Sequence, residues 1–353
     1  MADIRKIKPE NTKERINRAG NSIKNAQANE EDYRVIENWR SSHNKILNSW
    51  QAMLQNRCKG KEIVFAQRLK RKTTIFSKLS RQKQMMLSRM HDIAGCRLIF
   101  ESIEALMEFR ENLHAAKMDH TLKRSYDYIQ TPKTSGYRGV HDVFEYRART
   151  GRPKDWDGLK VEIQFRTLVQ HAWATAVEVA GSITGNQSKF DQGENDQIEF
   201  FKLASEIIAR SSERMYSCYP DISNSDIYER FKEINDRNGL LNKLKAIRIL
   251  GSFSSTSNVA IIIYSDPGTE VEIYRFDSLP AATQKYFELE KSPQGKDIVL
   301  VRGLNQENIR KAYQNYFSDT TDFVRLIEEG LTNLPGTSSF ESASNSQKLA
   351  QGA

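Results

Sequence analysis

The sequence lacks any apolar run near the roughly 20 residues that a membrane-spanning helix needs. Its first twenty residues, MADIRKIKPENTKERINRAG, also lack the hydrophobic core of a signal peptide. Cysteine is scarce: the three cysteines, at positions 58, 96 and 218, form no C-x-x-C pair and have no histidines at metal-ligand spacing. These absences argue against a disulfide framework and a structural zinc site. We therefore expect a cytoplasmic protein that makes no contact with a membrane. We also expect a monomer.

The chain has 353 residues, of which 38% are apolar and 28% charged. This composition is sufficient for a hydrophobic core, and the length suggests about two domains. The net charge of +8 is unevenly distributed, because residues 1–90 hold about 21 Lys and Arg against about 8 Asp and Glu. Such an asymmetry favours a polyanionic partner. A solvated basic helix face accounts equally well for the charge of the first 60 residues.

Hydrophobic periodicity predicts an α+β fold with a mixed β-sheet flanked by helices. Apolar residues at helical spacing predict helices up to about residue 90, and again over 103–116, 168–181 and 196–215. Strand patterns cover 96–102, 140–148 and 158–167. These elements define a first domain, which we place at residues 1–228.

A second pattern begins near residue 252. Three strands are predicted at 258–265, 270–278 and 296–303, with a helix at 279–292 and a last helix at 305–330. We therefore expect a small α+β C-terminal domain at 229–335. The small, polar residues 336–353 predict a disordered tail.

Two clusters of charged residues precede the predicted sheet. Arg68, Lys70 and Lys78 belong to a basic segment that would meet a polyphosphate if it faces a cleft, although a solvated helix face also explains it. Asp92 and Arg97 flank a glycine at the start of a predicted strand, a usual position for a metal-binding carboxylate. A lone aspartate there is more often a cap or turn residue.

The segment 124–141 is the most informative part of the sequence. It is rich in Pro, Ser and Gly, yet it also carries Lys133, Tyr137, Arg138 and His141. An ordered loop of this kind can offer an aromatic ring to a base and cations to phosphates. A plain turn would have little use for so many functional side chains.

The predicted strand at 158–167 has two different faces. Glu162, Gln164 and Arg166 alternate with apolar residues, so they share one face of the strand. A carboxylate there suits a metal ligand or a base near a hydroxyl group. A surface salt bridge with Arg166 would also explain the pair.

The order R-x-K, D-x-x-G-x-R, D-Y-I-x-x-P-K-x-x-G-Y-R-x-x-H and E-I-Q-x-R-T, with H-x-W after it, resembles the RelA/SpoT-homolog synthetase domain over roughly residues 60–185. The resemblance implies a magnesium-dependent enzyme that transfers the β,γ-pyrophosphate of ATP to a 3′-hydroxyl group and releases AMP. It also implies roles for residues that bind ATP. Arg68 and Arg97 would hold the adenine, and the phosphates would contact Lys70, Lys78 and Lys133.

The same resemblance implies a catalytic set of Asp92, Glu162 and Gln164. Asp92 and Glu162 would hold magnesium, and Glu162 would also help to deprotonate the attacking hydroxyl group. The acceptor base would stack on Tyr137, with Arg138 and His141 beside it. Phosphoryl-type transfer needs positioning and charge neutralisation rather than a covalent nucleophile, so these residue types suit the reaction.

The C-terminal elements resemble the antitoxin-like, pseudo-zinc-finger region of the CapRel fused toxin-antitoxin proteins. That resemblance implies a tRNA 3′ end as acceptor, autoinhibition by Tyr313 and Tyr316 in the ATP site, and release by a phage major capsid protein in anti-phage defence. The two tyrosines also fit a role in the core of their own domain. Two alternatives stay open: a small alarmone synthetase acting on GDP or GTP, and a non-catalytic RNA-binding module.

Overall fold

The computed structural model describes residues 7–149, 152–183, 191–245, 259–264, 272–276, 278–290, 297–303 and 320–334. A single eight-stranded sheet runs through it in the order β3-β4-β5-β2-β1-β8-β6-β7. The strands are β1 (Val64–Leu69), β2 (Ala94–Phe100), β3 (Thr121–Asp127), β4 (Val140–Glu145), β5 (Lys160–Thr167), β6 (Val259–Tyr264), β7 (Glu272–Phe276) and β8 (Asp297–Gly303). Strands β2 and β5 pair in parallel and the other neighbours pair antiparallel. The prediction of an α+β fold with a mixed sheet is confirmed.

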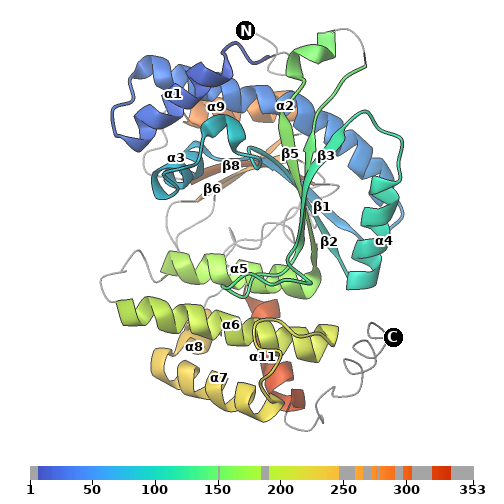
Figure 1. Ribbon diagram of the computed structural model, residues 1–353, viewed down its shortest axis with the longest axis vertical. Coiled ribbons are helices and arrows are strands. Elements are labelled where there is room, and N and C mark those ends of the chain that lie inside the picture. Colours follow the sequence, from blue (N-terminus) through green and yellow to red (C-terminus); the bar gives the residue numbers. More distant parts are fainter. Residues whose placement is uncertain are drawn as a thin grey trace, which may run out of the picture.

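Helices lie on both sides of this sheet (Figure 1). One side carries α1 (Lys13–Lys24), α2 (Glu30–Cys58), α4 (Ile103–His114) and α9 (Leu279–Glu290), and α3 (Lys72–Arg81) follows β1. The other side carries α5 (Leu168–Ile183), α6 (Asp191–Glu213), α7 (Asn224–Asn238), α8 (Leu240–Lys245) and α11 (Thr321–Asn333). Short 3₁₀ turns occur at Leu87–Arg89 and Arg152–Trp156. No helix in these described ranges is long and apolar enough to cross a membrane.

The larger core lies between the sheet and the layer of α2 and α4. The burial of β5 alternates, with Val161, Ile163 and Phe165 fully buried. They meet residues of α2 such as Trp50, which is also fully buried. A capping box at Asn29 fixes the start of this 29-residue helix. The opposite face of the sheet carries polar side chains such as Arg97, Glu162 and Gln164 as well as buried apolar ones such as Ile99 and Val143.

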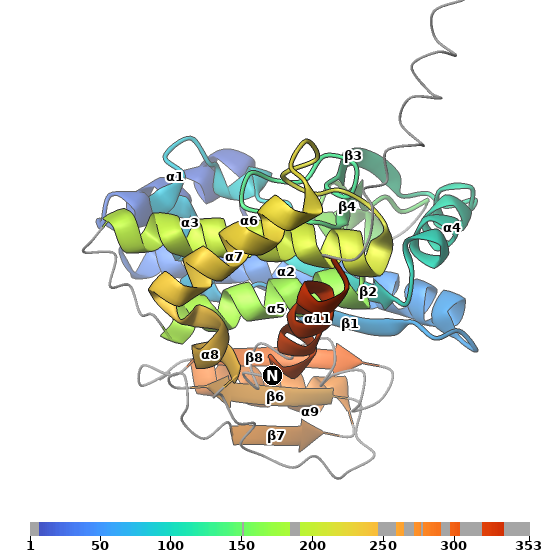
Figure 2. The same cartoon turned by 90° about the horizontal axis from the view of Figure 1, so that it is seen from below.

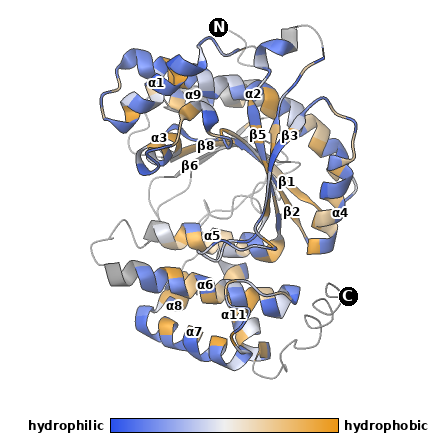
Figure 3. Cartoon of the chain, in the orientation of Figure 1, coloured by the Kyte–Doolittle hydropathy of each residue, from blue (hydrophilic) through white to orange (hydrophobic). Residues whose placement is uncertain are grey.

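The C-terminal elements join the N-terminal ones in both layers. Strand β8 pairs antiparallel with β1, and Figure 2 shows β8, β6 and β7 continuing the sheet beyond that strand. Helix α11 packs against α5 and α6, where Phe323 and Ile327 enter a second core with Phe200 and Ile207. Figure 3 shows hydrophobic and hydrophilic segments alternating along these helices, as expected of helices that bury one face. The division at residue 228 stays a prediction.

Two sequence predictions about the elements are wrong. The sequence predicts helices up to about residue 90, but Val64–Leu69 is strand β1, in which Phe65, Gln67 and Leu69 are buried on the α2 side. The segment 124–141 is predicted to be a loop, but its first residues belong to strand β3. This strand lies at the edge of the sheet, and its first five residues are exposed. The predicted strands of the C-terminal part are confirmed as β6, β7 and β8. Tyr313, Tyr316 and the predicted tail lie outside the described residues.

Candidate active site

The sheet register brings most of the predicted site residues to one face. Arg68 on β1 lies opposite Gly95 on β2, and Gly95 lies beside Glu162 on β5. One step along, Arg97 lies beside Gln164, and Gln164 opposite His141 on β4. Because laterally paired residues point to the same side of a sheet, these six share a face. Residues from four strands that are distant in the sequence thus form two adjacent rows.

Asp92 sits at the end of this face and is held by two lysines. Lys70 Nζ lies 2.7 Å from Asp92 Oδ2, and Lys78 Nζ lies 3.1 Å from Oδ1. Burial would raise the pKa of Asp92, but the charges and hydrogen bonds of the two lysines outweigh it and lower the pKa to about 2. Asp92 is therefore an ionised carboxylate that holds Lys70 and Lys78 next to the start of β2.

Glu162 is the second carboxylate of the site. Gln164 Nε2 donates to Glu162 Oε2 over 2.7 Å, and His141 Nδ1 lies 3.3 Å from Oε1. Burial would raise the pKa of Glu162 and the nearby charge of Asp92 acts in the same direction, but the hydrogen bond and charge of His141 lower it overall. The two carboxylates are thus close enough to influence each other, and both are ionised at neutral pH.

Tyr137 continues the network on the other side of His141. Its hydroxyl oxygen lies 2.5 Å from His141 Nε2 and accepts a hydrogen bond from Arg166 Nε over 3.1 Å. Burial would raise the pKa of Tyr137, but Arg166 and His141 lower it to about 8. Lys133 Nζ lies 5.0 Å from the centroid of the Tyr137 ring, a cation–π distance. Gly139, at φ +148°, leaves room for this hydroxyl group, since a Cβ there would lie 3.1 Å from it.

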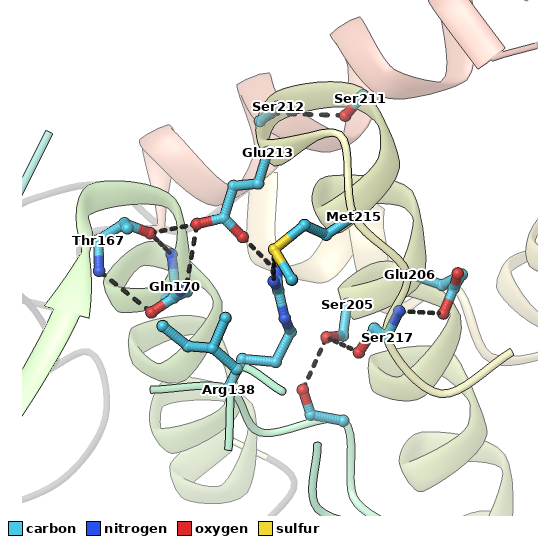
Figure 4. Close-up of polar contacts among 12 residues, drawn as sticks. Arg138, Thr167, Gln170, Ser205, Glu206, Ser211, Ser212, Glu213, Met215 and Ser217 are labelled. Carbon is cyan, nitrogen blue, oxygen red and sulfur yellow. Dashed lines mark hydrogen bonds and ion pairs between the residues drawn. The ribbon is translucent and has the colours of Figure 1, made fainter. Parts of the chain in front are cut away.

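The loop that carries Lys133 and Tyr137 is fastened to α6. Ser205 Oγ donates to the carbonyl of Gly136 over 2.7 Å. Figure 4 shows Ser205 on its helix, next to Ser217. Gly136 has φ +90°, and a Cβ there would lie 3.1 Å from backbone atoms of α6, so this contact requires glycine. This hydrogen bond and the close packing of Gly136 on α6 fix the direction in which the Tyr137 side chain leaves the loop.

Arg138 points away from the site, which corrects its predicted role at the acceptor. It is buried and donates from Nη1 to Glu213 on α6 (Figure 4). Glu213 also accepts hydrogen bonds from Thr167 Oγ1 over 2.6 Å and from Gln170 Nε2 over 2.9 Å. This cluster joins the loop to the ends of β5 and α6. Arg138 therefore helps to hold the loop against α6 and the end of β5.

Open space lies above Gly95, between Arg68 and Glu162. Among the described residues, a Cβ on Gly95 would meet only two backbone oxygens, of Arg68 at 3.9 Å and of Glu162 at 4.0 Å. Arg68 lies near enough to Lys70 to lower the pKa of that lysine, after the larger effect of burial. The face thus places the cations of Arg68 and Lys70 on one side of Gly95 and the carboxylate of Glu162 on the other.

The carboxylates suit a magnesium ion only in combination with a substrate. In the described part of the chain, no group of three or more His, Cys, Asp or Glu side chains is placed to hold a metal ion. Asp92 and Glu162 alone offer two carboxylates. Mg²⁺ is commonly bound by one or two carboxylates together with water and substrate phosphates, so this donor set fits such an ion.

The predicted site residues thus fall into three groups. Asp92, Lys70 and Lys78 form one cluster; Glu162, Gln164, His141, Tyr137 and Lys133 form a second; Arg68 and Arg97 lie on the strands between them. Sequence reasoning gave Arg166 no role in the site, although its alternation with Glu162 and Gln164 placed it on the same face. It also missed Tyr128, whose ring lies 4.3 Å from Lys133 Nζ.

Residues 67–181 match the family model described as a region found in RelA / SpoT proteins. The chain is therefore similar to RelA / SpoT proteins over this region, which holds every residue of the two carboxylate clusters. The matched part covers about a third of the chain, so the assignment concerns this region and not the C-terminal elements.

Two curated relatives match part of the chain. The GTP pyrophosphokinase YjbM of Bacillus subtilis (strain 168) is 38% identical over 89 residues, which is 25% of this chain and 41% of the relative. The GTP pyrophosphokinase YwaC of the same organism is 34% identical over 90 residues, 26% of this chain and 41% of the relative. The chain thus spans about two fifths of the length of these relatives.

Two solved structures are also similar to part of the chain. The small alarmone synthetase 1 of Bacillus subtilis bound to its product pppGpp is 23% identical, with a TM-score of 0.39, and covers 56% of this chain and 93% of its own. The small alarmone synthetase 2 of the same organism is 26% identical, with a TM-score of 0.38, and covers 46% and 84%. Because these TM-scores are low, the fold is established by the sheet order and register and not by these structures.

Proposed function

We propose that this chain is a RelA/SpoT-type pyrophosphokinase, a cytoplasmic enzyme that transfers the β,γ-pyrophosphate of ATP to a 3′-hydroxyl group. The observation that carries the proposal is the pair of ionised carboxylates, Asp92 and Glu162, among cations on one face of the RelA/SpoT region. A polyphosphate brings several negative charges, and Lys70, Lys78 and Arg68 are the cations placed to receive them. The open space above Gly95 lies between these cations and Glu162.

The residues of the site suggest how the transfer proceeds. The acceptor 3′-oxygen forms a bond to the β-phosphorus, the bond from that phosphorus to the α,β-bridging oxygen breaks, and AMP leaves with the electron pair. Glu162 takes the proton of the hydroxyl group, and Gln164 and His141 orient its carboxylate. Magnesium, held by Asp92 and Glu162 with the phosphates, would neutralise charge on the transferred group. The lysines beside Asp92 orient the phosphates.

A guanine nucleotide is the acceptor that the relatives favour, because both matching relatives are GTP pyrophosphokinases. Tyr137 is the aromatic side chain placed to stack on its base. Its ring is fixed on several sides, by His141, Arg166 and Lys133. A ring that is already held loses little conformational entropy when a base binds.

The tRNA 3′ end is the second candidate acceptor, and the exposed cations of edge strand β3 favour it. Lys123 and Arg124 are exposed on this strand, which pairs with β4 beside His141. Exposed cations next to the acceptor subsite would contact the phosphates of an acceptor stem. A free nucleotide would not extend so far. The second candidate function includes autoinhibition, and a phage major capsid protein that binds the C-terminal elements would relieve it.

The test uses the full chain. Truncation after residue 228 would remove β8 from β1 and α11 from α6, so point variants replace it. Wild-type protein and the Tyr313→Ala, Tyr316→Ala double variant are incubated with γ-labelled ATP, Mg²⁺, and GDP, GTP or bulk tRNA. Glu162→Gln should lower label transfer by about 100-fold or more. The matched control is Glu145→Gln on neighbouring strand β4, where Glu145 pairs with Lys123 and Arg147 at the strand end.

The outcomes separate the candidates. Label on GDP or GTP identifies an alarmone synthetase, and label on tRNA identifies the second candidate. For tRNA, Lys123→Ala with Arg124→Ala should lower labelling and make it less sensitive to salt, because fewer phosphates are contacted, and should leave labelling of a nucleotide unchanged. Transfer from the tyrosine variant alone would support autoinhibition, and purified major capsid protein should then restore transfer in the wild type. If Glu162→Gln and Glu145→Gln behave alike, or no acceptor is labelled, the pyrophosphokinase proposal is wrong.

A further inference from the structure

A buried arginine links the C-terminal helix α9 to the lysine beside Asp92. Arg40 on α2 has no exposed surface, and its Nε donates to the backbone carbonyl of Lys70 over 2.7 Å. Its Nη2 donates to the hydroxyl group of Tyr286 on α9, and its Cζ lies 5.2 Å from the centroid of that ring. Residues 246 positions apart thus meet in the interior.

Lys70 is held through its backbone on two sides. Its N–H donates to the carbonyl of Ile93 over 2.8 Å, and its carbonyl accepts from Arg40. Its side chain reaches Asp92, the residue directly before Ile93. A shift of Arg40 would therefore move the Lys70 backbone, and through it the distance between the ammonium group and Asp92. The link has three consecutive steps: Tyr286 to Arg40, Arg40 to the backbone of Lys70, and the Lys70 ammonium group to Asp92.

Arg40 is itself oriented by two elements. Glu37 on α2 accepts from Arg40 Nη1 over 3.2 Å and pairs with Lys72, which opens α3, over 3.3 Å. Tyr286 comes from α9 and is 1% exposed, in a small core with Ala282, Ile298 and Leu300. The core of α9 and β8 thus sets the position of the ring, and the ring sets the arginine. Interior packing transmits such shifts because side chains there have few alternative rotamers.

We propose that Arg40 is a positioning residue for the ATP side of the site, and that Tyr286 of the C-terminal segment sets its position. This inference rests on the proposed function for its kinetic consequence, but the contact itself does not depend on that function. A change in how α9 packs would reach Lys70 and Asp92 through Arg40 without any contact between the C-terminal segment and ATP. The C-terminal elements therefore support the active arrangement of these two residues.

The test is Tyr286→Phe in the full chain, which keeps the ring and removes the hydroxyl group that Arg40 reaches. The matched control is Tyr146→Phe: this buried tyrosine interacts with Ser49, further along the same helix α2. We expect Tyr286→Phe to lower kcat/KM for ATP by about tenfold and to leave KM for the acceptor unchanged. In an Arg40→Lys background, Tyr286→Phe should have no further effect, because the contact has already been lost.

Hydrogen–deuterium exchange provides a measure that needs no activity. The amide of Lys70 is bonded to Ile93, so Tyr286→Phe should speed exchange in peptides that cover residues 68–75, and Tyr146→Phe should not. If the wild type transfers pyrophosphate and the two variants have equal kcat/KM for ATP, the proposal is overturned. If the wild type transfers none, the proposed function fails and exchange alone decides: faster exchange in Tyr286→Phe upholds the link, and equal exchange overturns it.

Discussion

His141 lies between Tyr137 and Glu162 and contacts both with its two ring nitrogens, Nε2 at 2.5 Å from the phenol oxygen and Nδ1 at 3.3 Å from Oε1 of the carboxylate. Burial would lower the pKa of His141, but Tyr137 and Glu162 raise it. A protonated imidazole donates from both nitrogens, so this arrangement favours the cation. One imidazole ring thus orients both the aromatic side chain and the carboxylate of the acceptor side.

The first prediction concerns the ionisation of Tyr137. Its pKa of about 8 depends on Arg166 and His141, so an absorbance titration of the native protein at 295 nm should show one tyrosine that ionises near pH 8. Arg166→Met should move this step towards pH 10, and Tyr137→Phe should abolish it. Tyr219→Phe is the control, because burial and Glu199 raise the pKa of that tyrosine. A titration without any step below pH 9 would contradict the arrangement.

The same shift has a consequence for stability. The pKa of Tyr137 is lower in the folded chain than the ordinary value of 10, so its contribution to stability appears as pH rises through 8 and is complete above 10. Tyr137→Phe should therefore cost more unfolding free energy at pH 9.5 than at pH 7. Urea unfolding at the two pH values measures the difference.

The second prediction concerns Asp92 and the two lysines. Its pKa falls from 3.8 to about 2 in the folded chain, which corresponds to a contribution of about 2 kcal/mol to stability. A carboxyl group with a lowered pKa stabilises above its unfolded pKa, so the contribution is present above about pH 4 and is lost as pH falls towards 2. Asp92→Asn should destabilise the chain by about 2 kcal/mol at pH 7, and by about half of that at pH 3.

Urea unfolding of wild type and Asp92→Asn at both pH values tests this prediction. Asp119→Asn is the control, since Asp119 pairs with Arg149 at an exposed position, where ion pairs contribute little. A loss for Asp92→Asn that does not change with pH would mean that packing, and not the charge of the two lysines, holds this carboxylate.

The third prediction concerns the open space above Gly95. A Cβ fits there, with its nearest neighbours at 3.9 and 4.0 Å, so Gly95→Ala should stabilise the strand by about 0.5–1 kcal/mol. Gly95→Val suits a strand as well, but its methyl groups occupy the space between Arg68 and Glu162. We expect kcat/KM for ATP to fall by about 10- to 100-fold in the valine variant while thermal stability is kept. Equal activity of the alanine and valine variants would show that the substrate does not use this space.

Much of the site could be predicted because successive side chains of a strand point to opposite faces of the sheet. Glu162, Gln164 and Arg166 alternate with apolar residues, so their shared face follows from the sequence alone. Strand β1 is not predicted from the sequence, because Arg68 within it and Lys70 directly after it also fit a solvated basic helix face. The pairing of β1 with β2 and β8 decides its structure, and no local pattern contains that pairing.

Arg138 and Arg40 show where sequence reasoning ends. Arg138 follows Tyr137 directly, yet glycines with positive φ on either side turn the loop so that the two side chains leave it in different directions. Arg40 sits within an ordinary helical pattern, and its partners Lys70 and Tyr286 come from distant parts of the chain. The orientation of both arginines depends on tertiary contacts.

The last prediction tests whether the C-terminal helix α11 is part of the core below the site. Gly330 lies against α6, where an added Cβ would come within 2.5 Å of Ile207 Cγ2 and 3.1 Å of Ser211 Oγ. Gly330→Ala should therefore lower the free energy of unfolding by about 1–3 kcal/mol, because α11 must shift away from α6. Gly181→Ala on α5 is the matched control: a Cβ there meets no described atom within 4 Å, so the substitution should stabilise the helix by up to about 1 kcal/mol. Since α6 also holds Gly136 and Arg138, a shift of α11 should weaken binding of the acceptor as well. Equal stability of the two variants would mean that α11 packs loosely, and the truncated chain would then become a sound reagent for testing autoinhibition.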